Sequence, residues 1–368
     1  MRKKTIVVKI GSSSLTNATG ALDVAKLHDH TTAIGMLRRA GHQIVLISSG
    51  AVAAGYSLLG YPSRPVTVQG KQAAASIGQV ELMRHYSEAF QHENITVSQL
   101  LLTRENFSHS QQYRNAHQTL QELLKRGVLP IINENDSVAI DELTFGDNDM
   151  LSALVSGLVH AQMTILLTDI NGLYDCPPHL FPEAKKYQFL PAVTDELLKA
   201  AGKSSSNVGT GGMRSKVEAA KAAMAFGSQV FIGSGSGAEK LLDIIEGKGD
   251  GTYIGFQGNS QATTKKQWIA VHSVPKGTLI VDEGAAEAIL SKGRSLLRAG
   301  VLQMSGAFSA GDVVDVRNPS GQLIARGIAS MHSQQEVVQE KSNASDTTAP
   351  LIHRNNLVTI QQGEMIHE

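Results

Sequence analysis

Acidic and amide side chains gather in one stretch of this chain, at positions suited to binding a ligand. The apolar run Val128–Ile132 is followed at once by Asn133–Asp136, and Gly146–Asp149 leads into Met150–His160, where apolar residues recur at helical spacing. Polar clusters at a strand end and at a helix start occupy the usual place of a ligand in an open parallel sheet. Asn and Asp are also suited to holding the ammonium group of an amino acid.

Two lysines adjoin loops that are rich in Gly and Ser. Lys9 ends the run TIVVK and precedes Gly11–Ser14, and Lys216 follows Ser204–Gly212. Such loops bind phosphate through bare backbone N–H groups, and phosphoryl transfer needs fixed positive charge around the transferred group. The structural alternative is that Lys9 is an edge or snorkelling residue and that Lys216 faces water on its helix.

Asp147 and Asp149 flank Asn148 at the predicted helix start. Helix capping and the helix dipole account for one of these acids but not for the second. Because carboxylates in a desolvated pocket repel one another, lysines or a magnesium nucleotide would relieve the conflict. For Asn133 and Asp136 the structural alternative is an Asx turn.

The sequence gives less support for a standard nucleotide-binding motif, a histidine metal site or a reactive cysteine. Gly-rich turns also occur at Gly50, 209–212 and 233–237, but none matches the Walker pattern or a dinucleotide-type Gly-x-Gly-x-x-Gly, and each alone fits a tight turn. The 13 histidines show no metal-ligand spacing. The single cysteine, Cys176, excludes an internal disulfide framework and has no evident partner base, so we interpret it as a surface-loop thiol.

The elements that must position these residues alternate between strands and helices up to about residue 252, a rhythm that predicts a parallel sheet. We predict strands at 5–10, 43–47, 96–102, 128–132, 163–168 and 230–232, helices at 27–40, from 51, at 71–92, 115–126, 150–160, 213–226 and 239–246, and a short strand with a helix within 185–201.

From Trp268 the segments become short and alternating, which is typical of a small β domain. We therefore predict an α/β domain over 1–255, with an open, mostly parallel sheet flanked by helices, and a mostly-β domain over 264–368. The segment 255–261 is the predicted linker, and polar 334–350 is expected to be loosely ordered. Strands are predicted at 277–282, 301–304, 312–317 and 323–328, with one helix at 283–291.

Charge and hydropathy suggest a cytoplasmic protein. Lys and Arg together number 33, as do Asp and Glu, so no polyanion-binding surface is indicated at the level of the whole chain. No apolar run approaches the roughly 20 residues of a membrane span. The N-terminus passes directly into a strand.

Six ordered motifs in the first domain resemble the bacterial glutamate 5-kinases of the amino acid kinase family. They are VVKIGSSSLT (7–16), ISSGAVAAG (47–55), INENDSV (132–138), FGDNDMLSALVSGL (145–158), LLTDINGLY (166–174) and GTGGMRSK (209–216). In the second domain TLIVDEGAAEAIL (278–290) and FSAGDVVDV (308–316) resemble the PUA domain at the C-terminus of the long form of those enzymes. The resemblance covers nearly the whole chain.

The resemblance implies phosphorylation of the side-chain carboxylate of L-glutamate by ATP with Mg²⁺, giving glutamyl 5-phosphate for proline biosynthesis. A carboxylate is already a nucleophile at neutral pH, so no general base is needed, and catalysis reduces to in-line positioning and charge neutralisation. The resemblance also implies a homo-oligomer (dimer or tetramer), feedback inhibition by proline and hand-over of the labile product to glutamyl phosphate reductase.

Carried over position by position, the resemblance implies three groups of site residues. Lys9 and Lys216 would neutralise the phosphates and Asp149 would orient both lysines. Glutamate would be held by Ser49, Gly50, Asn133, Asp136 and Asn148. ATP would be bound by Lys9, Thr168, Asp169, Thr210, Gly211, Gly212, Met213, Arg214, Ser215 and Lys216. No direct metal ligand is implied, because ATP carries the magnesium, although Asp147 is a candidate for helping through water or magnesium.

Two alternatives remain open. One is another amino acid kinase, acting on aspartate, acetylglutamate, carbamate or UMP, against which the INENDSV motif and the PUA-like tail argue; Thr144 is a departure, since some family members carry lysine there. The other is an RNA-binding PUA protein. Residues 270–368 hold eight Lys and Arg against ten Asp and Glu, which argues against a nucleic-acid surface.

Overall fold

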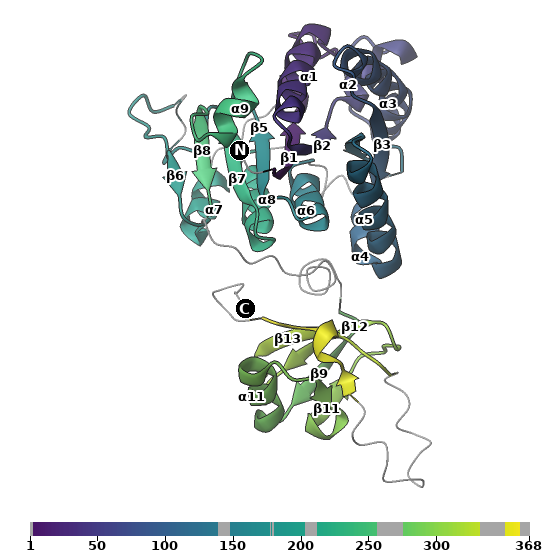
Figure 1. Cartoon of the computed structure of the whole chain (residues 1–368), viewed down its shortest axis with the longest axis vertical. Helices are drawn as coiled ribbons and strands as arrows, with labels where there is room; N and C mark the ends of the chain where they lie inside the picture. The colour runs from purple at the N-terminus through teal and green to yellow at the C-terminus, as the bar shows by residue number, and fades with distance from the viewer. Residues whose placement is uncertain are drawn as a thin grey trace. The chain divides into compact units, whose positions relative to one another are not determined.

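The computed structural model describes residues 3–138, 148–176, 178, 180–202, 212–255, 275–331 and 350–360. The chain divides into two compact units (Figure 1). The first comprises Met1–Asn106 and Arg114–Asn259, and the second comprises Phe107–Tyr113 and Ser260–Glu368.

The first unit is built on a mostly parallel sheet, as predicted. Its strands lie in the order β3-β4-β2-β1-β5-β7-β8-β6, and β7 with β8 is the antiparallel pair. Because β2 lies on one side of β1 and β5 on the other, the chain reverses its winding direction beside β1. The strands are β1 (Thr5–Ile10), β2 (Gln43–Ser48), β3 (Val97–Leu102), β4 (Leu129–Glu134), β5 (Met163–Leu167), β6 (Phe189–Leu190), β7 (Gln229–Gly233) and β8 (Gly251–Ile254).

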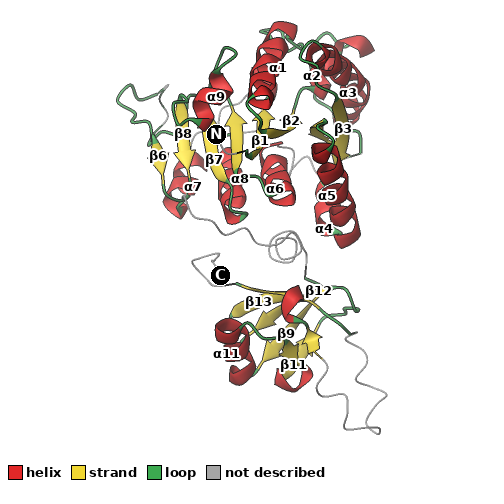
Figure 2. Ribbon diagram, viewed as in Figure 1, coloured by secondary structure: helices red, strands yellow, loops and turns green. Residues whose placement is uncertain are grey.

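Helices cover both faces of this sheet (Figure 2). On one face α1 (Val24–Arg39), α3 (Val68–Gln91) and α9 (Lys240–Ile245) pack on side chains that include Ile6, Val8 and Ile10 of β1. Strand side chains alternate between faces, so Lys9 points to the other face, where α6 (Asn148–Val159) and α8 (Met213–Ala225) lie. Further described helices are α2 (Ala51–Gly55), α4 (Arg104–Ser108), α5 (Ser110–Lys125) and α7 (Asp195–Gly202), of which the end of α4 and the start of α5 belong to the second unit.

Several elements begin or end at residues other than the predicted ones. Helix α1 starts three residues early because the Asp23 carboxylate caps it, accepting from the N–H groups of Ala25 and Lys26. Helix α5 also starts early, and α4 and β8 were not predicted. Strand β4 continues through Asn133 and Glu134, which pair with β3 instead of following the strand.

The second unit is mostly β, as predicted. A five-stranded sheet in the order β11-β9-β12-β13-β15 and a two-stranded sheet, β10-β14, enclose an apolar core with α11. The linker beyond Gly255 and residues 334–349 lie outside the described residues. The elements are β9 (Gly277–Val281), α11 (Glu283–Lys292), β10 (Leu296–Leu297), β11 (Val301–Ser305), β12 (Val313–Arg317), β13 (Leu323–Ile328), β14 (Pro350–Ile352) and β15 (Leu357–Thr359).

Within the described ranges of both units, no helix is both long and apolar enough to cross a bilayer.

Candidate active site

The candidate site lies at the carboxyl ends of the parallel strands. Ile10, Leu167 and Gly233 are in register across β1, β5 and β7, so these strands end at one edge of the sheet. The winding direction reverses between β1 and β5, and this reversal point is where open α/β sheets bind ligands.

A charged cluster forms on the α6/α8 face. Lys9 Nζ lies 2.5 Å from Asp149 Oδ1, and Lys216 Nζ lies 3.2 Å from Asp149 Oδ2. The side chains of Lys9, Lys216 and Asp149 are 5%, 9% and 0% exposed, respectively. The edge or snorkelling interpretation of Lys9 and the water-facing interpretation of Lys216 are therefore wrong. Asp149, in the first turn of α6, contacts lysines from opposite ends of the domain.

In this cluster one carboxylate holds two ammonium groups from different elements of the domain. Two fixed cations that converge on one point are suited to neutralising an anion placed beside them, and a phosphoryl group is such an anion.

A neutral network of amides and a hydroxyl adjoins the charged cluster. The backbone N–H of Glu134 donates to Asn133 Oδ1 over 2.9 Å, which settles which amide atom of Asn133 is oxygen. Asn148 Nδ2 must then be the donor to that oxygen, at 2.9 Å, and it also donates to Ser49 Oγ at 2.8 Å. The hydroxyl hydrogen of Ser49 is thereby left to donate to another acceptor, such as a substrate carboxylate.

Gly50 follows Ser49 in a backbone conformation that favours glycine. Its φ of 109° lies in the left-handed region, where a Cβ would be strained. The turn is fastened to the sheet, since the Ser49 N–H donates to the carbonyl oxygen of Ile10. Gly50 is buried, and α2 begins at the next residue.

Asp136 occupies a half-buried turn just beyond β4. Burial raises the pKa of this carboxyl to about 6, and the charge of Arg64 opposes the rise. A raised pKa indicates that the carboxylate form lacks full compensation, so Asp136 would gain from a cationic ligand such as an ammonium group.

The predicted nucleotide residues lie at two positions. Thr168, directly after β5, donates its N–H to Gly233, and its hydroxyl donates to Asp169 over 3.0 Å. Gly212 is the N-cap residue of α8, and no side chain accepts hydrogen bonds from the first N–H groups of the helix there. These N–H groups can therefore bind an anion. In the first turn of α8, Met213 is half-buried, Arg214 is exposed, and Ser215 Oγ lies 3.2 Å from Asp149 Oδ2. Thr210, Gly211, Asp147 and Thr144 lie outside the described residues.

The Gly-rich turn after β7 is tied to the first helix of the chain. The N–H of Gly237 donates to Asp29 Oδ1 over 2.9 Å, and the same carboxylate pairs with the buried Lys240. These contacts join α1 to α9. They give residues 233–237 a structural role, in line with the tight-turn interpretation.

A buried histidine supports the first Gly/Ser loop. His30 Nε2 lies 3.2 Å from the carbonyl oxygen of Ser14. Burial first, and then the charge of Lys240, lower the pKa of His30 to about 4, so the ring is neutral at physiological pH. Since a carbonyl oxygen only accepts, Nε2 carries the hydrogen and donates it to Ser14.

Sequence reasoning missed the residues of α3 that reach the site. Gln79, which is 8% exposed, accepts from Asn133 Nδ2 at 2.9 Å, and Tyr86 OH lies 2.8 Å from Ser48 Oγ. Both lie on the buried face of α3 with Ala75 and Leu82. A polar side chain recurring among apolar ones at helical spacing was the available signal.

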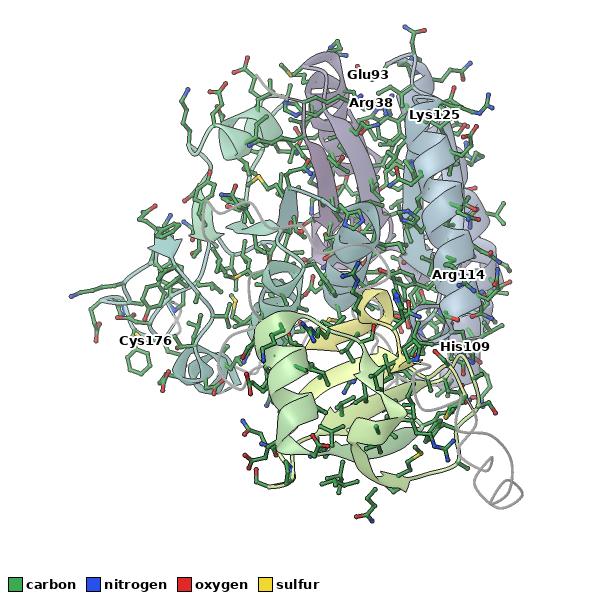
Figure 3. All side chains as sticks on the ribbon, turned by 60° about the horizontal axis from the view of Figure 1, so that its bottom comes forward. Arg38, Glu93, His109, Arg114, Lys125 and Cys176 are labelled. Atoms are coloured by element: carbon green, nitrogen blue, oxygen red, sulfur yellow. The ribbon has the colours of Figure 1, made fainter. Side chains whose placement is uncertain are left out.

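Among the described residues there is no group of three or more His, Cys, Asp or Glu side chains that could hold a metal ion. Cys176 lies on the loop after β5 (Figure 3). Burial and a hydrogen bond with Asp175 raise the pKa of its thiol, which disfavours the nucleophilic thiolate.

Comparison with known proteins agrees with this geometry. The family model described as "Amino acid kinase family" matches residues 4–234. The chain belongs to the amino acid kinase family. The model of the PUA domain matches residues 277–347, so this amino acid kinase carries a PUA domain after its kinase domain.

Full-length relatives of this amino acid kinase are known. The chain is 54% identical over 366 residues to "Glutamate 5-kinase 1" of Bacillus subtilis, with 98% of this chain and 100% of the relative covered. It is 54% identical over 372 residues to "Glutamate 5-kinase" of Halalkalibacterium halodurans, with 99% of each covered. Among solved structures, carbamate kinase from Giardia lamblia gives a TM-score of 0.49 at 18% identity, covering 68% of this chain and 98% of that one.

Proposed function

We propose that this chain phosphorylates the side-chain carboxylate of L-glutamate with ATP, giving L-glutamyl 5-phosphate, the first step of proline biosynthesis. The observation that carries the proposal is the adjacency of Asn148 and Asp149. The amide of Asn148 orders a network suited to a carboxylate acceptor, and the next side chain holds two lysines suited to a phosphoryl group. The names of the full-length relatives support glutamate as the acceptor.

In this proposal the acceptor binds to the amide side of the site. Ser49 donates its hydroxyl hydrogen to the reacting carboxylate, and the N–H of Gly50 faces the same end. Asn133 and Asn148 hold glutamate through their amides. Asp136 pairs with the ammonium group, which relieves the cost of its buried charge.

The phosphoryl group binds to the lysine side. Lys9 and Lys216 neutralise the charge that develops on the transferred group, and Asp149 keeps both ammonium groups aimed at it. The substrate carboxylate is the nucleophile, so no side chain has to remove a proton. Transfer then depends on in-line alignment of the carboxylate and the γ-phosphate.

The nucleotide is assigned to Thr168, Asp169 and the start of α8. The N–H groups after Gly212, which have no side-chain cap, and the two lysines of the cluster suit a triphosphate. Magnesium carried by the nucleotide would neutralise the phosphates further. Thr210 and Gly211 are proposed to contact the nucleotide. Asp147 is proposed to help bind its magnesium, directly or through water.

The wider biology follows from the proposed reaction. We propose that the kinase domain spans 1–255 and the PUA domain 264–368, and that the enzyme acts in the cytoplasm as a homo-oligomer. Proline is the proposed feedback inhibitor, with a site that overlaps the glutamate loop. An acyl phosphate hydrolyses readily, so we propose hand-over to glutamyl phosphate reductase.

The test is to trap the product. Purified chain is incubated with ATP, Mg²⁺, L-glutamate and hydroxylamine, which converts an acyl phosphate to a coloured hydroxamate. We expect hydroxamate that depends on both glutamate and ATP, with far less from aspartate, N-acetylglutamate or carbamate. An equal yield with aspartate, or none with glutamate, would contradict the proposal.

A further inference from the structure

Helix α3 reaches the acceptor side of the site at two points. Gln79 and Tyr86 lie about two helical turns apart, on one face of the helix. Their side chains are buried, at 8% and 0% exposed. Gln79 contacts Asn133, and Tyr86 contacts Ser48. Ser48 directly precedes Ser49, and Asn133 is itself a residue that the proposed function places against glutamate.

The Tyr86 contact has a defined direction. Ser48 Oγ donates to the carbonyl oxygen of Ser49 over 3.0 Å, and it lies 2.8 Å from Tyr86 OH. A serine hydroxyl has one hydrogen, so Tyr86 must be the donor to Ser48. The Ser49 carbonyl and the Gly50 N–H belong to one planar peptide unit, so holding the oxygen fixes where the N–H points.

The Gln79 contact fixes the orientation of the Asn133 side-chain amide. Because the Glu134 N–H fixes Asn133 Oδ1, the amide nitrogen of Asn133 points to Gln79 Oε1, 2.9 Å away. This pair keeps Asn133 Oδ1 available to Asn148 Nδ2. Without the Gln79 oxygen, Asn133 would lose the buried acceptor that holds its orientation.

Close packing makes α3 a firm support for both contacts. Gly78 and Gly55 bring the backbones of α3 and α2 together, and the space a Cβ on Gly78 would need is filled by the carbonyl oxygen of Ala51. Helix α2 begins directly after Gly50. A shift of α3 would therefore be transmitted to the Ser49–Gly50 turn.

We propose that Gln79 and Tyr86 are positioning residues for the acceptor carboxylate, an inference that rests on the proposed function. Tyr86, through Ser48, orients the Gly50 N–H toward the reacting end of glutamate. Gln79, through Asn133 and Asn148, keeps the Ser49 hydroxyl as a donor. Helix α3 thus sets the direction of two donors without touching substrate.

The first test is a double-mutant cycle on full-length enzyme. With hydroxamate formation as the readout, Tyr86→Phe and Ser48→Ala are each expected to lower kcat about five- to tenfold, the value of one hydrogen bond, with the ATP KM unchanged. If the two residues act in one relay, the double variant is no slower than the worse single variant. The control, Tyr253→Phe, removes a hydroxyl that bonds Ile244 at the other end of the sheet and should keep the wild-type kcat.

The second test addresses Gln79. Gln79→Leu is expected to raise the glutamate KM about tenfold, again without changing the ATP KM, while Ser87→Ala on the exposed face of α3 changes neither. Melting temperatures within the scatter of the controls would separate positioning from loss of fold. Wild-type kinetics in Tyr86→Phe and Gln79→Leu, or effects that multiply in the double variant, would overturn the inference. Wild-type enzyme that makes no hydroxamate from glutamate would overturn the proposed function itself.

Discussion

The two sides of the candidate site are built from different chemistry. The lysine side consists of Lys9, Asp149 and Lys216, three ionised groups that are almost fully buried. The acceptor side consists of the neutral groups Ser49, Asn133 and Asn148. Asn148 Nδ2 donates a hydrogen bond to each of the other two. The two sides meet at Asn148 and Asp149, which are neighbours in the first turn of α6.

This difference separates rate from recognition. Buried fixed charge is most effective where charge develops during the reaction, because it is poorly screened and already oriented. A neutral network with fixed polarity adds little field, but it rejects a ligand whose donors and acceptors do not match. We therefore expect changes on the lysine side to act on kcat and changes to the Ser49, Asn133 and Asn148 network to act mainly on the glutamate KM. The relay from Tyr86 to the Gly50 N–H meets the reacting end of glutamate and is expected to act on kcat.

The largest effect is expected from Lys216→Met, which keeps the length of the side chain and removes its charge. With one of two fixed cations lost, kcat should fall about a thousandfold while the glutamate KM changes little. The measurement is steady-state hydroxamate formation. Lys221→Met is the matched control, since Lys221 lies on the same helix in an exposed ion pair with Asp195. A kcat close to that of the control would remove Lys216 from the mechanism.

An intermediate effect is expected from Asn148→Ala. It deprives Ser49 Oγ and Asn133 Oδ1 of their shared donor, although Asn133 Oδ1 keeps the N–H of Glu134. The link between Ser49 and Asn133 is lost, so the glutamate KM should rise about tenfold to a hundredfold. Asn148→Asp should be worse than alanine, because an ionised carboxylate cannot donate and repels the substrate anion. If Asn148→Asp binds glutamate more tightly than Asn148→Ala, a hydrogen-bond donor is not required at position 148, which would contradict the proposed directions of these hydrogen bonds.

A smaller effect on the glutamate KM is expected from Asp136→Asn, together with an increase in the stability of the fold. The folded chain raises the pKa of Asp136 from 3.8 to about 6, so its ionised form destabilises the fold above pH 6 and has no such effect below about pH 4. The variant should melt at a higher temperature than wild type at pH 8 and at the same temperature at pH 4. Its glutamate KM should rise about tenfold at pH 8, because the ammonium group loses its counter-charge.

The pH dependence of wild-type enzyme gives the control for Asp136. The wild-type glutamate KM should rise as the pH falls below 6 and Asp136 is protonated, and this rise should be absent from Asp136→Asn. A lower melting temperature for Asp136→Asn at pH 8 would show instead that the carboxylate is already compensated in the free enzyme.

Local patterns were enough to predict most of the fold. The apolar runs that became β1, β2 and β5 and the helical spacing after Met150 led to the α/β class and to the helix start at the acidic cluster. Strand β8 was missed because its four residues, which begin with glycine, show no alternation and are held by pairing with β7. Asn133 was placed after its strand because the neighbour that extends β4 is β3, a contact between distant segments.

The site was predictable in its residue types and less so in its contacts. Lys9 and Lys216 were found because each adjoins a Gly/Ser-rich loop, but their common carboxylate could be named only through the family resemblance. Gln79 and Tyr86 carry no turn, cap or motif signal, since they lie in the middle of a long helix. Helical spacing could have placed them on the buried face of α3, but their contacts with Asn133 and Ser48 depend on tertiary packing, which no local pattern encodes.

The most direct test of the division between rate and recognition is one kinetic comparison of Lys9→Met with Asn148→Ala. Both kcat and the glutamate KM are measured by hydroxamate formation at saturating ATP. We predict that Lys9→Met lowers kcat and leaves the glutamate KM nearly unchanged. We predict that Asn148→Ala raises the glutamate KM and lowers kcat by a smaller factor. Equal changes of both parameters in the two variants, or the reverse pattern, would contradict the account.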